Sequence, residues 1–342
     1  MFTDRIKAKI VRLPIKKYCG LIKKKRKYLC IANPFGGKRQ AENIFKDSVV
    51  PIFEIFNIDY NLVTTTGRDF VQNYFRDNYI SGSTDTVAYS LNGNNDPQTL
   101  AIRICLGDKL QVDVGGIYLN SNFALHQCFL SMCGYGFHGN IIENSEQLRW
   151  LGPMRYDLSG FTNLMKNNHY KGHLRILKES VDRFSTNNES QLCVSRNLLN
   201  NFEVENADRI TVRKGNFSAI NAFNISCKCA KAPNGAAPKV CPSDGHMDLV
   251  IVNRCGRIDF LQNLILMSNS KKGQDDQPKQ YELPFVEVHR TRGFSFHIEE
   301  NEKTSGWCYD GELLKDAEIY CLIHQQMVEI YGSNDYLDFP TF

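Results

Sequence analysis

The chain has 342 residues, of which 42% are hydrophobic and 23% are charged, and its net charge is +4 at neutral pH. This composition is ordinary for a folded protein and excludes disordered, collagen-like and repeat architectures. No run of about 18 apolar residues exists, so we expect no membrane-spanning helix. The first 27 residues lack the apolar core of a secretory signal, so no leader peptide is expected.

The charge is divided unevenly along the chain. Residues 1–27 contain eleven Lys and Arg against one acid, Asp4, which leaves the remaining residues with a net negative charge. A basic arm of this kind suits an anionic surface such as membrane headgroups, nucleic acid or a nuclear import receptor. A solvated tail explains the same composition, and the sequence leaves these alternatives open.

The predicted elements begin with an alternation of strands and helices. Residues 28–32 form a short apolar run that predicts a buried parallel strand, which ends in Asn33-Pro34-Phe35-Gly36-Gly37-Lys38. A helical pattern follows, then a strand at 58–63 and a second helix at 68–79. This β-α-β-α order is typical of the start of a doubly wound sheet.

The pattern breaks at the junction of Ile80 and Ser81. A third strand is expected after the second helix, but Ile80 leads directly into Ser81-Gly82-Ser83-Thr84-Asp85 and a helical run from Thr86. A parallel crossover needs a dozen or more residues and a strand to receive it. The sequence therefore predicts a truncated α/β domain at 28–97.

From Thr99 onward the sequence predicts a β-rich domain at 98–332, an antiparallel sandwich, followed by a tail at 333–342. Helices are expected near 141–167 and 256–269, and polar loops at 181–206 and 270–281. A turn at Lys214-Gly215 separates two of the strands. The predicted strands are 99–106, 109–118, 122–133, 171–178, 208–214, 217–226, 247–253, 283–289, 292–299 and 317–331.

Two segments have the composition of nucleotide-binding loops. Residues 33–38 follow a strand and open a helix, where backbone N–H groups favour phosphate and glycines allow close approach. Residues 81–85 offer hydroxyl and N–H donors. A simple strand-to-helix turn explains the first segment and an N-cap explains the second, so neither is decisive alone.

Three later segments are further candidates. Residues 134–140 contain three glycines and are predicted to form a phosphate or substrate loop. Arg149 and Arg155 suit a polyphosphate clamp or a solvated helix face. The carboxylates of Asp310-Gly311-Glu312 suit Mg²⁺, although Asp-Gly more commonly forms a turn between two strands.

Taken together and in this order, these segments resemble the ceramide kinases, lipid kinases with a diacylglycerol-kinase-type catalytic domain. The resemblance runs from about Tyr28 to Tyr331. It implies a Rossmann-like nucleotide domain and a β-sandwich domain, with ATP and lipid as ligands. It also implies transfer of the γ-phosphoryl group of ATP to the primary hydroxyl of ceramide, assisted by Mg²⁺, at the cytoplasmic surface of membranes, with no nucleic acid partner.

The resemblance implies roles for particular residues. Asn140 falls on a polar lipid contact that is often acidic in the family, and Asp310 and Glu312 fall on the metal contact. The implied ATP contacts are Asn33, Pro34, Phe35, Gly36, Gly37, Thr64, Thr65, Thr66, Gly67, Arg68, Gly82, Ser83, Thr84, Arg149, Arg155, Asp310, Gly311 and Glu312.

The departures from the family fall at the break after Ile80. The Gly-Gly-Asp-Gly loop, whose Asp is the family's general base, is absent, as are the strand before Gly82 and the family's pleckstrin-like domain. No residue here matches the base, so the chain as it stands is expected to be nearly inactive. Three hypotheses remain: a lipid kinase that lacks an internal segment, a pseudokinase that binds nucleotide or lipid, and a basic-armed scaffold.

Overall fold

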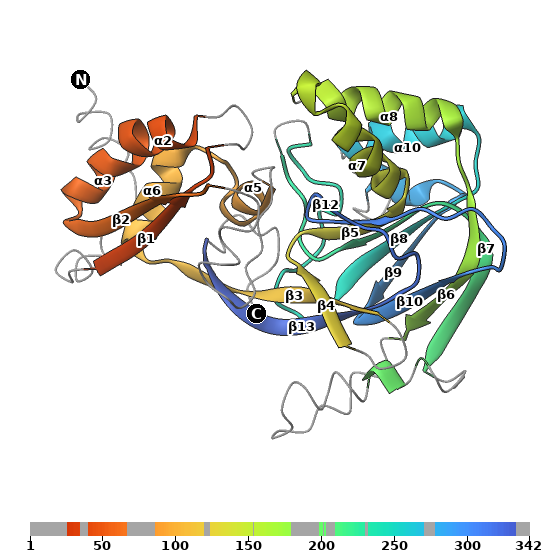
Figure 1. Cartoon of the computed structure of the whole chain (residues 1–342). Helices are drawn as coiled ribbons and strands as arrows, with labels where there is room; N and C mark the ends of the chain where they lie inside the picture. Colours follow the sequence, from red (N-terminus) through yellow and green to blue (C-terminus); the bar gives the residue numbers. More distant parts are fainter. Residues whose placement is uncertain are drawn as a thin grey trace. The chain divides into compact units, whose positions relative to one another are not determined.

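The computed structural model forms two compact units (Figure 1). The first unit contains the described residues up to Leu110 together with 329–332, and the second contains those from Gln111 to Val328. Residues 1–25 of the basic arm, the helix predicted at 68–79, the junction after Ile80 and the C-terminal tail lie outside the described residues, and Arg26 and Lys27 belong to the first strand. The structure describes residues 26–34, 40–66, 86–119, 124–152, 154–178, 198–200, 202, 209–229, 232–269 and 278–332.

The first unit begins with the predicted parallel strand pair. Strands β1 (Arg26–Ala32) and β2 (Ile58–Thr64) pair in parallel along their whole length. A continuous helical run connects them, formed by α2 (Ala41–Ile44), η3 (Phe45–Val49) and α3 (Val50–Ile55). The β-α-β start of the chain is therefore confirmed.

The strand predicted at 99–106 is wrong, because this segment is helix α6 (Pro97–Leu106). The Asp96 carboxylate accepts a hydrogen bond from the amide of Thr99 at 3.0 Å, which caps the helix start. Gly107 ends the helix with a φ of 85°, a conformation that glycine adopts without strain. The apolar run of this segment covers one helix face and packs against α3.

Helix α5 (Thr86–Asn92) confirms the helical run predicted from Thr86. The core of the first unit is a layer of apolar side chains shared by the helices and the strand pair. It contains Ile52, Phe53, Phe56, Ile58, Ala101, Ile102, Cys105 and Leu106.

The second unit is built on an 11-stranded sheet. Its main path has the order β12-β11-β5-β7-β6-β10-β13-β3-β4, and β8 joins it by pairing with β7 and β9. The paired strands run antiparallel. The strands are β3 (Lys109–Leu119), β4 (Ala124–Phe129), β5 (Met132–Gly136), β6 (Tyr170–Leu177), β7 (Ile210–Phe223), β8 (Met247–Asn253), β9 (Val286–Thr291), β10 (Gly293–Ile298), β11 (Trp307–Tyr309), β12 (Glu312–Leu314) and β13 (Ile319–Tyr331).

Two strand boundaries were predicted wrongly. The strand predicted at 122–133 is two strands, because the chain bends at 130 and 131 between β4 and β5. The chain continues as the single strand β7 through Lys214 and Gly215, where a turn was expected. Gly215 lies opposite Gly172 of β6, so the ladder is unbroken there. The short strands β11 and β12 were not predicted, because three residues are too few to show an alternating pattern.

Helices α7 (Phe137–Gln147), α8 (Met154–Lys166) and α10 (Arg257–Asn269) lie together over the sheet of the second unit (Figure 1). A short 3-10 turn, η4 (Arg149–Leu151), separates α7 from α8. A second 3-10 turn, η7 (Lys279–Glu282), lies at the end of the polar stretch predicted as a loop. The helices predicted near 141–167 and 256–269 are thus confirmed.

Aromatic side chains form the centre of the second unit. Tyr135 and Trp307 are fully buried, with ring centroids 5.0 Å apart, and Phe296 lies 4.8 Å from Tyr135. The chain is therefore an α/β unit followed by an antiparallel β-rich unit, as the sequence predicted. No helix in the described part of the chain is long and apolar enough to cross a membrane.

Candidate functional site

The carboxyl edge of β1 and β2 brings two predicted ATP contacts together. Ala32 and Thr64 are register partners at the last position of the pair. The Thr65 amide donates to the Ala32 carbonyl at 2.8 Å, and the Thr65 hydroxyl reaches the Asn33 amide oxygen at 3.4 Å. Ligands of doubly wound sheets bind at this edge, so Asn33 and Thr65 lie where a ligand of such a sheet would bind.

A carboxylate at this edge was not predicted. Glu42, in the first turn of α2, accepts a hydrogen bond from the Thr64 hydroxyl at 2.8 Å. An acidic side chain is favourable near a helix N-terminus because the helix dipole places partial positive charge there. Nothing in the sequence around Glu42 predicts its contact with Thr64 of β2, because the two residues are 22 positions apart.

Several predicted ATP contacts fall outside the described residues, so the structure does not test them. Pro34 and Thr66 are described beside Asn33 and Thr65, and Thr66 is exposed. The side chain of Arg149 is also outside the description. The remaining contacts outside it are Phe35, Gly36, Gly37, Gly67, Arg68, Gly82, Ser83 and Thr84.

The glycine-rich segment 134–140 is not a loop, which corrects the prediction. It forms the end of β5 and the first turn of α7, with Gly136 at a φ of 76° between them. A Cβ on Gly139 would lie 1.9 Å from the Gly306 carbonyl oxygen. The last glycine therefore permits close packing of α7 and leaves no room for a phosphate between these backbones.

Asn140 lies in a polar network at the start of α7. Its amide nitrogen donates to the Tyr170 hydroxyl at 2.7 Å, and its amide oxygen accepts from the Ser305 hydroxyl at 3.0 Å. The Ser305 amide in turn donates to the Tyr135 hydroxyl at 3.0 Å. Burial raises the pKa of Tyr170, so its hydroxyl keeps its proton. These partners were missed because they lie 30 and 165 residues from Asn140.

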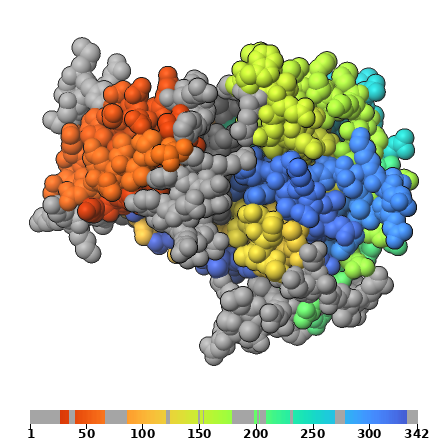
Figure 2. All heavy atoms as spheres, viewed as in Figure 1, coloured from red at the N-terminus to blue at the C-terminus, as the bar shows by residue number. Residues whose placement is uncertain are grey.

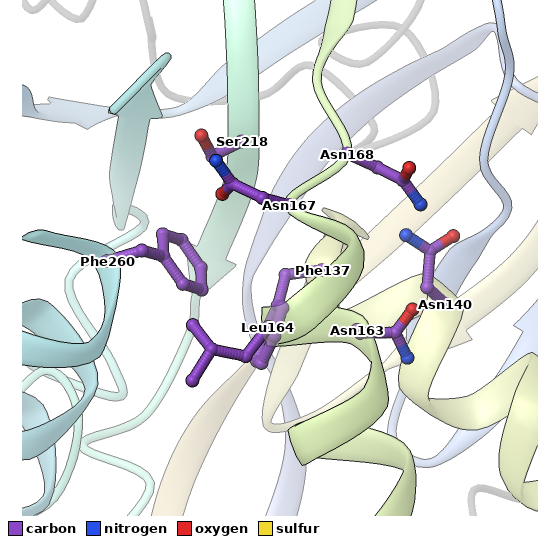
Figure 3. A pocket seen from close by; sticks show the side chains of 8 residues that line it. All are labelled: Phe137, Asn140, Asn163, Leu164, Asn167, Asn168, Ser218 and Phe260. Carbon is purple, nitrogen blue, oxygen red and sulfur yellow. The ribbon is translucent and has the colours of Figure 1, made fainter. Parts of the chain in front are cut away.

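Asn140 also lines a small pocket beneath α8 (Figure 3). Its free volume is about 10 Å³, close to that of one water molecule. In Figure 3 the carboxamides of Asn140, Asn163 and Asn168 lie on one side of the pocket, and Phe260 and Asn167 lie on the other. The lining residues are Phe137, Asn140, Asn163, Leu164, Asn167, Asn168, Ser218 and Phe260.

Asp310 and Gly311 form the turn between β11 and β12. Their φ angles are 44° and 90°, as in the two-residue turns that connect twisted hairpins. The Asp310 carboxylate accepts hydrogen bonds from the amides of Leu130, Ser131 and Met132 at 2.6, 2.8 and 3.2 Å, and from the Ser131 hydroxyl. Asp310 therefore fastens the connection between β4 and β5 to this hairpin.

These contacts do not fit direct coordination of Mg²⁺ by Asp310. A carboxylate has about four acceptor positions, and Oδ1 of Asp310 accepts three hydrogen bonds while Oδ2 accepts one. Among the described residues, no group of three or more His, Cys, Asp or Glu side chains could hold a metal ion.

Arg155, the second predicted phosphate contact of the helical region, lies in the first turn of α8. Its guanidinium donates to the Tyr156 hydroxyl at 2.6 Å and lies 4.6 Å from the centre of that ring. This cation–π contact holds the guanidinium against the helix while leaving other donors for a ligand.

Comparison with known families settles the kinship of the chain. The family model of the ceramide kinase C-terminal domain matches residues 129–336, more than half of the chain. The chain belongs to the ceramide kinase family. The match spans the sheet of the second unit from β5 onward, the Asn140 network and the Asp310 hairpin, so these features lie within the region matched by the ceramide kinase C-terminal domain.

Whole-chain relatives agree with this assignment. The chain is 27% identical to a mouse ceramide kinase, over 89% of this chain and 74% of the relative. It is 30% identical to a rice ceramide kinase, over 77% of this chain and 49% of the relative. A putative diacylglycerol kinase from Bacillus anthracis has the same fold, with a TM-score of 0.59 at 15% identity over 91% of this chain and 96% of that one.

The length of the mouse alignment is informative. It extends over 401 positions, more than the 342 residues of the whole chain. The mouse relative therefore contains residues within the aligned region that have no counterpart here.

Proposed function

We propose that this chain is a ceramide kinase-like lipid kinase, which transfers the γ-phosphoryl group of ATP to the primary hydroxyl of ceramide. The observation that carries the proposal is the β1–β2 edge, where Asn33 and Thr65 meet in a chain of the ceramide kinase family. The nucleotide binds over this edge and contacts Asn33, Pro34 and residues 64–66. Gly36 and Gly37 after Pro34, and Gly82, Ser83 and Thr84 after Ile80, complete its phosphate contacts.

Mg²⁺ accompanies ATP and neutralises its phosphates when bound. Magnesium commonly keeps several waters and uses substrate phosphates as ligands, so it does not require a cage of protein side chains. The hydrogen bonding of Asp310 agrees with this arrangement.

The polar head of the lipid is proposed to bind at the Asn140 network. Asn140, Tyr170 and Ser305 provide uncharged donors and acceptors, which suit the neutral amide and hydroxyl groups of ceramide. The apolar lining of the adjacent pocket, which includes Phe137 and Phe260, suits the beginning of a hydrocarbon chain. The free volume of this pocket must increase for a lipid to enter.

Transfer itself requires a base for the attacking hydroxyl, and efficient bases lie within hydrogen-bond reach of it. The segment that holds this base in the family has no counterpart between Ile80 and Ser81. In the described part of the chain β1 pairs with β2 alone, which agrees with a missing neighbouring strand. We therefore expect turnover of the chain in its present form to stay well below about 1 per second, the low end for kinases.

The same missing base favours a second candidate function, binding of nucleotide or lipid without turnover. The two candidates are separated by incubating the purified chain with γ-labelled ATP, Mg²⁺ and ceramide in mixed micelles. Melting temperature with and without ATP is measured on the same preparation, because a ligand of the native state raises it.

Slow label transfer to ceramide supports the lipid kinase. A melting temperature raised by ATP without transfer supports the second candidate. Neither transfer nor an effect of ATP on melting would contradict both proposals.

A further inference from the structure

Helix α8 exposes its apolar face and buries its polar face. Met154, Leu158, Phe161 and Met165 are 69, 43, 61 and 43% exposed. Their spacing of four, three and four residues places them on one side of a helix with 3.6 residues per turn. The opposite side carries Ser159 and Asn163, which are buried against the protein. A surface helix normally has the reverse arrangement.

Helix α10 exposes a second apolar stripe. Ile258, Leu261 and Ile265 are 83, 42 and 50% exposed and are spaced by three and four residues. The opposite side of α10 buries Phe260 and Asn263. The exposed apolar residues of α10 are therefore confined to one side of the helix.

The two stripes belong to one surface. Helices α8 and α10 contact one another, and their yellow-green and cyan surfaces adjoin in Figure 2. Trp150 lies in the turn η4, which contacts α8, and is 79% exposed. We call these eight side chains the apolar face: Trp150, Met154, Leu158, Phe161, Met165, Ile258, Leu261 and Ile265. Exposed apolar surfaces of this extent mark interaction sites.

The charges around the apolar face indicate which partner it fits. The segments 154–166 and 254–269 contain Arg155, Lys166, Arg254 and Arg257 against two acids, Asp157 and Asp259, so they are net positive. Most of the chain differs, because the residues after the basic arm are net negative as a whole. An anionic surface therefore attracts the segments that carry the apolar face.

We propose that the apolar face docks on the surface of an anionic lipid bilayer, with α8 and α10 lying in the plane of the headgroups. Helices with an apolar face of Trp, Phe, Leu and Ile and basic neighbours bind in this way, and Trp side chains favour the interfacial depth. The proposal concerns a surface separate from the phosphoryl-transfer site and does not depend on turnover. It also differs from attraction through the basic arm, because it requires insertion of apolar side chains.

The two tryptophans make insertion directly measurable. Trp150 is 79% exposed while Trp307 is fully buried, and the chain has no others. The full chain is titrated with vesicles of phosphatidylcholine and phosphatidylserine, with and without lipids that carry a quencher in the acyl chain. We expect a blue shift of the emission and quenching by the acyl-chain label. Trp150→Phe should abolish both signals, since Trp307 remains in the core.

Variants on each helix test the face itself. The double variants Met154→Ser/Phe161→Ser and Ile258→Ser/Ile265→Ser are each expected to weaken vesicle binding at least about tenfold, because apolar burial drives interfacial binding. The matched control is Leu125→Ser/Met327→Ser, which removes two apolar side chains of similar exposure, 49 and 50%, elsewhere in the unit. The control should bind as the unaltered chain does, and all variants should keep the melting temperature because the residues are exposed.

The salt dependence of vesicle binding distinguishes insertion of the apolar face from charge attraction through the basic arm. At about 0.5 M salt the attraction between exposed charges is strongly screened, whereas the shift of Trp150 on saturating vesicles should persist. Three results would overturn the proposal: no shift of Trp150, equal binding by the α8 variant and the control, or a self-associated chain that Phe161→Ser converts to monomers without any vesicle binding. The last result would assign the face to a second copy of the chain.

Discussion

The β1–β2 edge of the first unit and the sheet of the second unit use their polar candidate residues in opposite ways. At the edge, Asn33 and Thr65 contact each other through one long hydrogen bond of 3.4 Å. In the second unit, Asp310 accepts four hydrogen bonds and both the nitrogen and the oxygen of the Asn140 amide are hydrogen-bonded. The edge holds polar groups at the end of its strands, where ligands of doubly wound sheets bind, whereas the second unit uses the polar groups of Asp310 and Asn140 to hold its own strands and helices.

This difference shows that residues which match family motifs can have two different roles. A residue that falls on a family motif can be a ligand contact, an anchor of the fold, or both. Hydrogen bonds already made within the protein show how much of the residue remains for the ligand. Substitutions in the sheet should therefore act mainly on stability, and substitutions at the edge mainly on nucleotide binding.

The largest expected effect is that of Asp310→Ala. Removal of the carboxylate leaves three backbone amides and the Ser131 hydroxyl without their acceptor, which should lower the free energy of unfolding by roughly 3–4 kcal/mol. Urea unfolding measures this. The exposed Asp316→Ala is the control and should change it by less than about 0.5 kcal/mol. A stable Asp310→Ala that loses ATP binding would show that the residue serves the ligand instead.

The pH dependence of stability should change in Asp113→Asn. Burial raises the pKa of Asp113 to about 6, although the amides of Gly245 and Gln326 donate to its carboxylate. The folded state thus holds the proton more tightly than the unfolded state, so this residue's contribution to stability declines as pH rises from about 4 to 6.

Relative to Asp113→Asn, the unaltered chain should lose about 3 kcal/mol over that interval, from the size of the shift. Unfolding by urea at several pH values measures the difference, with Asp316→Asn as the exposed control. Parallel pH profiles for the unaltered chain and Asp113→Asn would be incompatible with a raised pKa.

Two helical glycines provide a matched pair for close packing. Gly139→Ala places a Cβ against the Gly306 carbonyl oxygen of the neighbouring backbone and should destabilise the chain by about 2 kcal/mol. Gly160→Ala meets no atom closer than 3.9 Å and should be neutral or stabilise α8 by up to about 1 kcal/mol. Thermal unfolding compares them. Equal effects would mean that α7 has room to move away from Gly306.

The smallest expected effect on stability is at the edge. Thr65→Val removes a single long hydrogen bond to Asn33 and keeps the shape of the side chain, so it should cost only about 0.5 kcal/mol. Chemical unfolding in urea detects this, and ATP titration on the same variant should show weaker binding. A loss above about 2 kcal/mol would show that the edge is as structural as the Asp310 turn.

Much of the fold follows from local sequence patterns. Continuous apolar runs predicted β1 and β8, and the alternation at 58–63 predicted β2. The segment 99–106 was predicted wrongly as a strand, because a buried helix and a buried strand can both have a run of apolar residues. Its flanking Asp96, Pro97 and Gly107 are the physical signals of a helix start and a helix end, although Gly107 also fits a turn between two strands.

The candidate site was predictable only where topology brings neighbours together. Asn33 and Thr65 end adjacent parallel strands, so their meeting follows from the β-α-β order. The partners of Asn140 and of Asp310 come from strands and turns 30 to 180 residues away. Local periodicity contains no information about such pairings. The number of hydrogen bonds that the Asp310 carboxylate accepts is therefore visible only in the structure.

Titration of the purified chain with Mg²⁺ and ATP, monitored by calorimetry, tests the central claim that the β1–β2 edge is the nucleotide site. Asn33→Ala should weaken ATP binding at least about tenfold, the loss expected when one good hydrogen bond to a charged ligand is removed. Asn61→Ala, which alters an exposed residue in the middle of β2, should leave the affinity unchanged. Equal affinities for the unaltered chain and Asn33→Ala, or no ATP binding at all, would contradict the account.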